Sequence, residues 1–380
     1  MSRSLVTAIL LLSSSAAHAA LGCSNPCTSG TLTQTGTFYD VFVDCSSGAY
    51  SAATGTAHPA GPSQNVIYGG STGTAGTSSL GVYFHSTGQH FSSDNEAGAT
   101  LIAPNGSCTF DPPDTPTEFS NRGIETEWTV VDASGNQYLW RHEVVTFGDS
   151  ATNAGARLTQ SMTALTQPAD VGLRWQIDYQ SGFDDGPTWS NVECDPYSVS
   201  APVSIETEFA SSELLDFYRM INNDGFTPIE IFTSTVNLDG FPDTYTPDRL
   251  IYGAWFSLTG AAWNYNPFPQ TADFDSAVLY YYGYNFPLES VFVPLNSEVR
   301  RSIVLFNAID SDDCGEFEPI DTGDPPDTDP PPDTDPPDTD PPELTWIYAG
   351  GCASCNSSGG APLSVAMLLL AVPLLRRREG

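Results

Sequence analysis

The sequence contains no lysine: all 12 of its basic residues are arginines, against 46 aspartates and glutamates. Schiff-base chemistry, P-loops and Ser–Lys catalytic pairs each need an amine, so this absence excludes them. The formal net charge of −34 argues against nucleic acid as a partner, because binding requires neutralisation of phosphates. It argues equally against adsorption to anionic lipid. No G-x-G-x-x-G motif follows an expected strand, and we expect the chain to use no cofactor.

Strong helix formers are scarce outside the two ends of the chain, whereas Gly, Thr, Ser, Val, Tyr and Phe are abundant. Short runs of alternating apolar residues, separated by turn residues, predict strands. The expected strands are Phe38–Asp44, Val66–Tyr68, Gly81–His85, Glu125–Val131, Gln137–Phe147, Arg157–Leu165, Gly172–Tyr179, Val203–Phe209, Glu230–Asn237, Leu250–Leu258, Ala277–Tyr284 and Val299–Phe306. Residues 211–221 fit either a short helix or a strand. The sequence therefore predicts an all-β fold, a large antiparallel β-sandwich over residues 21–309, as one sandwich or as two with a break near residues 110–122.

Residues 1–20 have the plan of a signal peptide. Arg3 precedes an apolar stretch, Leu5–Leu12, and Ala17-His18-Ala19 fits the small-residue cleavage rule. A buried N-terminal helix is the structural alternative, and a lipoprotein with lipid on Cys23 is another. We expect an exported protein.

The tail, residues 344–380, carries a short apolar segment at 361–375 followed by three arginines. The segment is shorter than the roughly 20 residues of a stable span, and arginines at its end would stay cytoplasmic. With Cys352 and Cys355 just before it, the tail resembles the MYXO-CTERM sorting signals of myxobacteria. The resemblance implies processing near these cysteines by a sorting protease in the membrane, at the cell surface or outer envelope of a Gram-negative bacterium. An ordinary single-pass anchor is the alternative and gives the same topology.

Residues 310–343 form an acidic, proline-rich stalk in which Asp-Thr-Asp-Pro-Pro begins at Asp327, Asp333 and Asp338. Proline fixes φ and the aspartates repel one another, so we expect an extended spacer. Calcium binding by the Asp-Thr-Asp units is the alternative, but paired prolines oppose the tight turn of a calcium loop.

An even number of cysteines outside the tail supports export and predicts disulfides whose pairing the sequence leaves open. The six are Cys23, Cys27, Cys45, Cys108, Cys194 and Cys314. A zinc site is the rival interpretation, but the close pair Cys23 and Cys27 has no second close pair or nearby histidine.

Four segments together resemble a known fold family. Val171–Asp178 leads into the Gly182–Pro187 turn, and Pro247–Gly253 and Asp275–Tyr280 follow later. This succession is similar to the supersandwich domains shared by galactose-mutarotase-like and polysaccharide-processing proteins, over about residues 120–308. The resemblance implies a fold and no particular activity. Within it, Asp184-Asp185-Gly186 is typical of a turn, and Arg174 with Asp178 fits a buried structural pair.

Motifs for catalysis or metal binding are weak. Gly69–Gly73 matches G-x-S-x-G, but no helix is expected after it, so the match indicates a loop. His85 and His90 flank a turn near Asp94 and Glu96, a spacing too loose to assign a metal. Carboxylate pairs for glycoside hydrolysis stay open, because they converge in space and not in sequence.

Aromatic residues give the clearer functional hint. Consecutive tyrosines on one strand point to both faces of a sheet, and flat exposed rings suit the C–H faces of sugars. The candidate ligand-binding residues are Trp255, Trp263, Tyr265, Tyr280, Tyr282 and Tyr284. The alternative is that these rings simply fill a large core.

These observations predict an exported, surface-anchored β-sandwich for adhesion or carbohydrate binding, with a glycan as partner and without enzymatic activity. Two alternatives remain: a polysaccharide-active enzyme of the same fold, and a structural envelope protein without a small ligand.

Overall fold

The computed structural model describes residues 25–110, 122–148, 150, 154–194, 197–221, 229–235, 238, 241, 243–272 and 274–306. All of these belong to one compact unit. The signal peptide, the stalk, the tail and the cysteines at 23, 314, 352 and 355 lie outside the described residues. Among the described residues, no helix has the length and apolar character needed to cross a bilayer.

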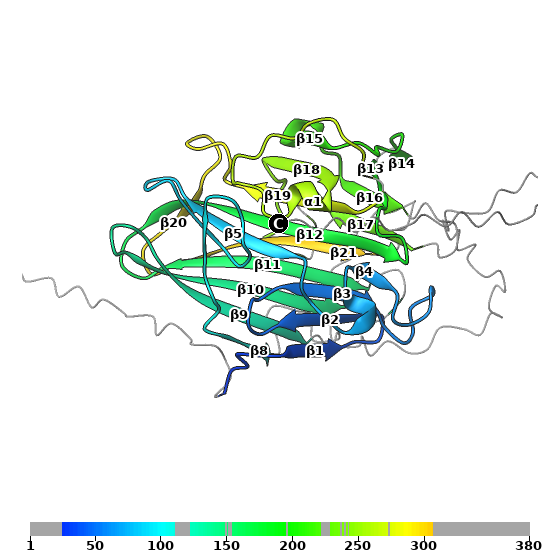
Figure 1. The fold of residues 1–380 in the computed structure, drawn as a ribbon, viewed down its shortest axis with the longest axis horizontal. Coiled ribbons are helices and arrows are strands. Elements are labelled where there is room, and N and C mark those ends of the chain that lie inside the picture. The colour runs from blue at the N-terminus through cyan, green and yellow to red at the C-terminus, as the bar shows by residue number, and fades with distance from the viewer. Residues whose placement is uncertain are drawn as a thin grey trace, which may run out of the picture. The chain divides into compact units, whose positions relative to one another are not determined.

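The described chain forms an all-β, largely antiparallel sandwich of two sheets (Figure 1). The first sheet contains β1 (Thr31–Thr35), β2 (Tyr39–Asp44), β3 (Tyr50–Thr54), β4 (Asn65–Ile67), β5 (Ser79–Phe84), β6 (Gln89–Ser92), β7 (Ala99–Leu101), β12 (Ala169–Gly182), β15 (Thr207–Ala210), β18 (Arg249–Ala254), β19 (Ser276–Tyr282) and β20 (Val291–Val293). Its order is β1-β2-β3-β4-β12-β19-β18-β15, and β5 and β20 also pair with β12. The long strand β12 is therefore the strand around which this sheet is organised.

The second sheet has the order β14-β13-β16-β17-β21-β11-β10-β9-β8. Its strands are β8 (Gly106–Phe110), β9 (Gly123–Val131), β10 (Gln137–Phe147), β11 (Gly155–Ala164), β13 (Thr188–Cys194), β14 (Tyr197–Val199), β16 (Phe217–Ile221), β17 (Glu230–Ser234) and β21 (Glu298–Phe306). Strands β8 and β9, which flank the break considered near residues 110–122, pair with each other in this sheet.

Three single turns of helix complete the described elements: η1 (Gly70–Thr72), η2 (Ser211–Glu213) and α1 (Trp255–Leu258). The ambiguous segment 211–221 is thus a short 3₁₀ turn followed by strand β16. The strand expected over Leu250–Leu258 ends at Ala254, and its last four residues form α1 instead.

Alternation along β12 sends one set of side chains between the two sheets. Trp175, Ile177 and Tyr179 enter the main core, where they join Trp128 and Trp140 of the facing sheet. Trp140 also donates its indole N–H to the Gln160 side chain at 2.9 Å. The one polar group of the ring therefore has a hydrogen-bond partner inside the core.

The opposite face of the first sheet is also covered, by α1 and the segment that follows it. Leu258 and Trp263 of this segment pack on Ile251, Leu279 and Tyr281. All seven residues of β19 are buried as a result. The expectation that consecutive tyrosines on this strand leave some rings outside is therefore wrong, because both faces of the sheet are packed.

A buried histidine in the main core gives a prediction about acid stability. His142 is 1% exposed, with its ring 4.7 Å from the ring of Tyr50, and burial lowers its pKa from 6.5 to about 3. The folded state thus keeps the ring neutral while the unfolded state takes up a proton below pH 6.5, so stability falls as the pH drops from 6.5 towards 3. We expect His142→Leu to remove about 3 kcal/mol of the stability difference between pH 7 and pH 4.

Urea denaturation of both proteins at the two pH values measures this difference. Carboxylates that titrate in the same range contribute equally to both proteins and cancel. An unchanged pH dependence in the leucine variant would mean that His142 is not the source.

Candidate metal centre

Most of the aromatic residues expected to bind a ligand lie in the interior. Tyr280, Tyr282 and Trp263 are 0%, 2% and 7% exposed. The Tyr280 hydroxyl donates to the backbone oxygen of Ser234 at 3.0 Å, and the Tyr282 hydroxyl donates to that of Tyr245 at 2.8 Å. These rings hold packed elements together and offer no face to a ligand.

The other three expected ligand-binding residues, Trp255, Tyr265 and Tyr284, are half-buried and pack against the cluster around Tyr281. Tyr265 donates its hydroxyl to Glu206 at 2.6 Å, and the guanidinium carbon of Arg249 lies 4.4 Å from the centroid of the Tyr284 ring. Both rings are thus engaged within the protein.

Among the cysteines, Cys27 and Cys45 form a disulfide, with their Cα atoms 5.7 Å apart. Cys194 is also disulfide-bonded, and Cys108 is buried. The bonded pair includes one of the two cysteines considered for zinc, which excludes Cys27 as a thiolate ligand in this state.

Arg174 is fully buried and pairs with Glu96, not with Asp178. Glu96 Oε2 also lies 3.1 Å from His90 Nε2. Arg174 donates a hydrogen bond to the backbone oxygen of Ala262 at 3.1 Å. The expected Arg174–Asp178 pair is therefore wrong, and the guanidinium occupies the place beside His90 and Glu96 that a metal would need.

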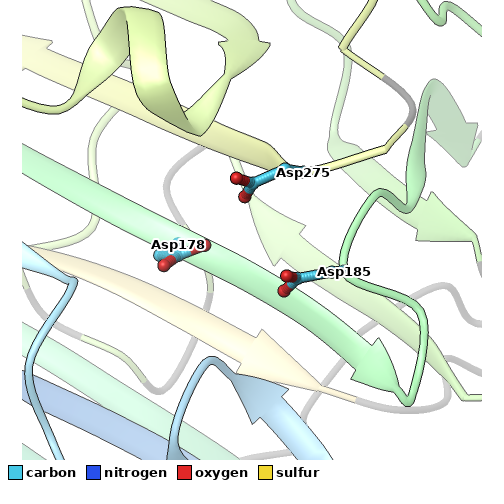
Figure 2. Close-up of side chains that lie close together, drawn as sticks. All are labelled: Asp178, Asp185 and Asp275. Atoms are coloured by element: carbon cyan, nitrogen blue, oxygen red, sulfur yellow. The ribbon is translucent and has the colours of Figure 1, made fainter. Parts of the chain in front are cut away.

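Three aspartates, Asp178, Asp185 and Asp275, lie close together beside β12 and β19 (Figure 2). Asp178 lies on β12, Asp185 lies in the turn after β12, and Asp275 directly precedes β19. One carboxylate oxygen of each lies within 4.8 Å of the others. Among the residues that the structure describes, this is the one group of three acidic, histidine or cysteine side chains with metal-binding proximity. We call it the aspartate cluster.

The turn after β12 brings the cluster together. Gly182 ends the strand with φ of +67°, a left-handed conformation that glycine adopts without strain. Asp184 then accepts a hydrogen bond from the Gly186 amide at 3.0 Å, and the backbone oxygen of Asp185 accepts one from the Ser276 amide at 2.8 Å. The turn is thus hydrogen-bonded to the start of β19, which sets Asp185 beside Asp275.

Electrostatics oppose full ionisation of the aspartate cluster. Burial, reinforced by the neighbouring carboxylates, raises the pKa of Asp178 well above its ordinary value. Burial and the charges of Asp275 and Asp184 raise the pKa of Asp185 to about 6, and burial raises that of Asp275. No arginine among the described residues forms an ion pair with the three. The arrangement suits either shared protons or a bound cation.

Three exposed phenylalanines lie near the aspartate cluster: Phe183 and Phe274 are close to it in sequence, and Phe256 stacks on Phe274. Phe183, Phe256 and Phe274 are 75%, 52% and 56% exposed. Phe256 and Phe274 stack with centroids 5.7 Å apart and an angle of 24° between the rings; we call them the phenylalanine pair. The Trp255 amide, which begins α1, donates to the backbone oxygen of Asp275 at 2.8 Å. This bond ties the pair to the cluster.

Comparisons with known proteins concern architecture alone. No family model and no curated protein matches the chain. The solved structures that resemble it include a GalM/aldose epimerase homologue from C. elegans, with 9% identity and a TM-score of 0.42, and a galactose mutarotase related enzyme from Lactobacillus acidophilus, with 7% identity and a TM-score of 0.40. Each comparison covers 73% of this chain, and 98% and 97% of the respective structures. Similarity at this level carries no information about what the present chain binds.

Proposed function

We propose that the sandwich is the carbohydrate-binding domain of an exported, surface-anchored protein without enzymatic activity, and that it binds through the phenylalanine pair. The observation that carries the proposal is the pair itself: two large apolar rings, stacked on each other and each more than half exposed. Exposure of such a flat apolar surface to water is unfavourable, and a ligand that covers it removes this cost. The C–H face of a sugar ring has a matching shape, and its hydroxyls would meet the neighbouring polar groups.

The polar groups near the pair can serve hydroxyls. Phe274 is followed by Asp275, and Phe256 is followed by Ser257. Gln270 hydrogen-bonds to Ser257 and to Glu206. Small-molecule binding sites usually combine an apolar surface with a few carboxylates, hydroxyls or amides.

Two places among the described residues are poorly suited to glycoside hydrolysis. His90 and Glu96 are both 4% exposed and are held by Arg174, so they are closed to substrate. A groove of about 440 Å³ is lined by Gln34, Thr35, Gly36, Thr37, Phe38, Tyr39, Asp40, Thr56, Arg122, Thr146, Phe147 and Gly148. It holds a single carboxylate, Asp40, whereas glycoside hydrolysis usually needs two.

Display at the surface is supported by the sequence: the leader at 1–20, the stalk at 310–343 and the tail with its three arginines. The proposal includes processing of the tail by a membrane sorting protease. Recovery of the chain from the cytosol with both ends intact and its thiols reduced would contradict this part.

Binding by the phenylalanine pair is tested on a glycan array with the mature chain. We expect Phe256→Ala to weaken binding to any positive glycan by about tenfold, since an aromatic contact contributes roughly 0.5–1.5 kcal/mol beyond its buried area. Phe292→Ala is the matched control. Phe292 is also 56% exposed but pairs with Asp170, at the opposite end of β12.

An array without any binding, over a broad set of glycans, would remove the ligand from the proposal. Equal weakening by the Phe256 and Phe292 substitutions would place the ligand elsewhere on the sandwich.

A further inference from the structure

We propose that the aspartate cluster binds one calcium ion, which links the turn after β12 to the start of β19. The site shares Asp275 with the sugar-binding proposal but does not depend on it. It rests on the convergence of Asp178, Asp185 and Asp275, with one oxygen of each within 4.8 Å of the others. Ionised carboxylates from a strand, a turn and a strand start, brought this close without an arginine, repel one another unless they share protons or a cation lies between them.

The second observation is a set of buried oxygen atoms without hydrogen-bond partners. Asp178 is 2% exposed, yet its Oδ1 has no partner, and neither has Oδ1 of Asp185. A buried polar atom is nearly always satisfied, because leaving it unsatisfied costs its full desolvation. Two such atoms within one cluster point to a ligand that accepts lone pairs.

Two further oxygens come from neighbouring residues. Gln176 Oε1 is buried and has no partner among the described residues, and the Thr77 hydroxyl lies close enough to Asp178 for a hydrogen bond that lowers the pKa of that carboxyl. Gln176 lies two positions before Asp178 on β12, so both side chains point to the same face of the sheet. Gln176 donates to the backbone oxygen of Thr77 at 3.2 Å, and the next residue, Ser78, accepts the Asp178 amide at 3.0 Å. These contacts set Thr77 and Gln176 beside the cluster.

The donor chemistry selects the ion. Every available donor is oxygen, from carboxylates, a hydroxyl and an amide, which suits hard cations and not zinc, whose protein sites use nitrogen and sulfur. Calcium accepts six to eight oxygens in irregular arrangements, whereas magnesium requires a near-ideal octahedron and retains several waters. The donors come from a strand, a turn and the residue before a second strand, and such an irregular set suits calcium better than a regular octahedron.

The ion would add a further link between two segments that already meet through hydrogen bonds. Asp185 belongs to the turn that hydrogen-bonds to Ser276, and Asp275 accepts the amide that begins α1. Phe274 precedes Asp275 directly. Calcium would therefore also hold the backbone under the phenylalanine pair, whether or not that pair binds sugar.

The test uses the full mature chain, freed of metal with EGTA and titrated with calcium chloride in a calorimeter and in thermal unfolding. We expect one high-affinity site and a rise in Tm of several degrees at saturation, because a ligand that binds only the folded state stabilises it. Asp178→Asn should lower the affinity of this site at least tenfold. Asp170→Asn is the matched control: it lies on the same strand and accepts a hydrogen bond from Ser290, away from the cluster.

The outcomes are distinct. Without calcium, Asp178→Asn should have a Tm equal to or above that of the parent chain, because asparagine keeps the size of the side chain and cannot carry a charge that repels Asp185 and Asp275; this result shows that the variant folds. A calcium response that is the same in the parent and in Asp178→Asn would overturn the proposal and assign the binding to other acidic segments, such as the stalk. No response in the parent would also overturn it. Calcium binding without glycan binding would leave this site in place and remove only the sugar.

Discussion

Replacing Trp189 with alanine is expected to destabilise the sandwich by about 3–5 kcal/mol, the cost of deleting a large ring from a packed interior. Trp189 lies on β13 and is 0% exposed. Its ring stacks on Tyr218 with centroids 3.9 Å apart and on Phe209 with centroids 5.1 Å apart. Because Phe209 belongs to the first sheet and Tyr218 to the second, the tryptophan is wedged between the two layers.

Urea denaturation followed by tryptophan fluorescence and far-UV circular dichroism measures the loss from Trp189→Ala. Phe256→Ala is the control, since that ring is 52% exposed and its removal leaves no cavity; we expect a change below about 1 kcal/mol. A loss of less than about 1 kcal/mol for the tryptophan variant would mean that the two sheets are not packed through this residue.

The second large effect concerns Arg174. Its ion pair with Glu96 is completely buried, at 0% side-chain exposure for both partners. Replacing only the arginine, as in Arg174→Met, leaves the Glu96 carboxylate buried without its cation, and we expect a loss of about 3–5 kcal/mol. Replacing both residues, as Arg174→Met with Glu96→Leu, removes both charges and should cost clearly less than the single substitution.

The comparison of single and double variants by urea denaturation separates charge from packing. If the double variant is as unstable as the sum of the two single variants, the ion pair contributes no coupling. The loss would then come from the packing of the long side chains, including the contact of Arg174 with the Trp263 ring at 5.9 Å.

The strands that could be predicted from the sequence are those with one strong local pattern. Gln137–Phe147 is confirmed at both ends as β10, because its apolar run is bounded by a tight turn and a glycine. Tyr50–Thr54, strand β3, was missed, since it consists mainly of small residues and owes its position to β2 and β4 on either side. The strand predicted over Gly172–Tyr179 is confirmed but is longer, Ala169–Gly182. Pairing with β20 and β4 extends it beyond its own apolar pattern.

The candidate site was harder to predict than the fold. The Asp184-Asp185-Gly186 segment was expected as a turn, and the bond from the Gly186 amide to Asp184 has that form. No local sequence pattern predicts that Asp275 lies beside Asp178 and Asp185, because this proximity depends on the pairing of β12 with β19. A single signal was present: Asp178 lies in a central strand between the apolar residues Ile177 and Tyr179, where a buried charge requires a compensating partner.

Strand β21 has a mechanical consequence for a displayed protein. It is the last strand described, and it lies inside its sheet with β11 on one side and β17 on the other. If the chain is tethered through the residues beyond Phe306, tension enters along the axis of this strand. Ladder hydrogen bonds lie perpendicular to that axis, so the load shears them together instead of peeling them one at a time. A domain tethered in this way should unfold only at forces high enough to shear this ladder.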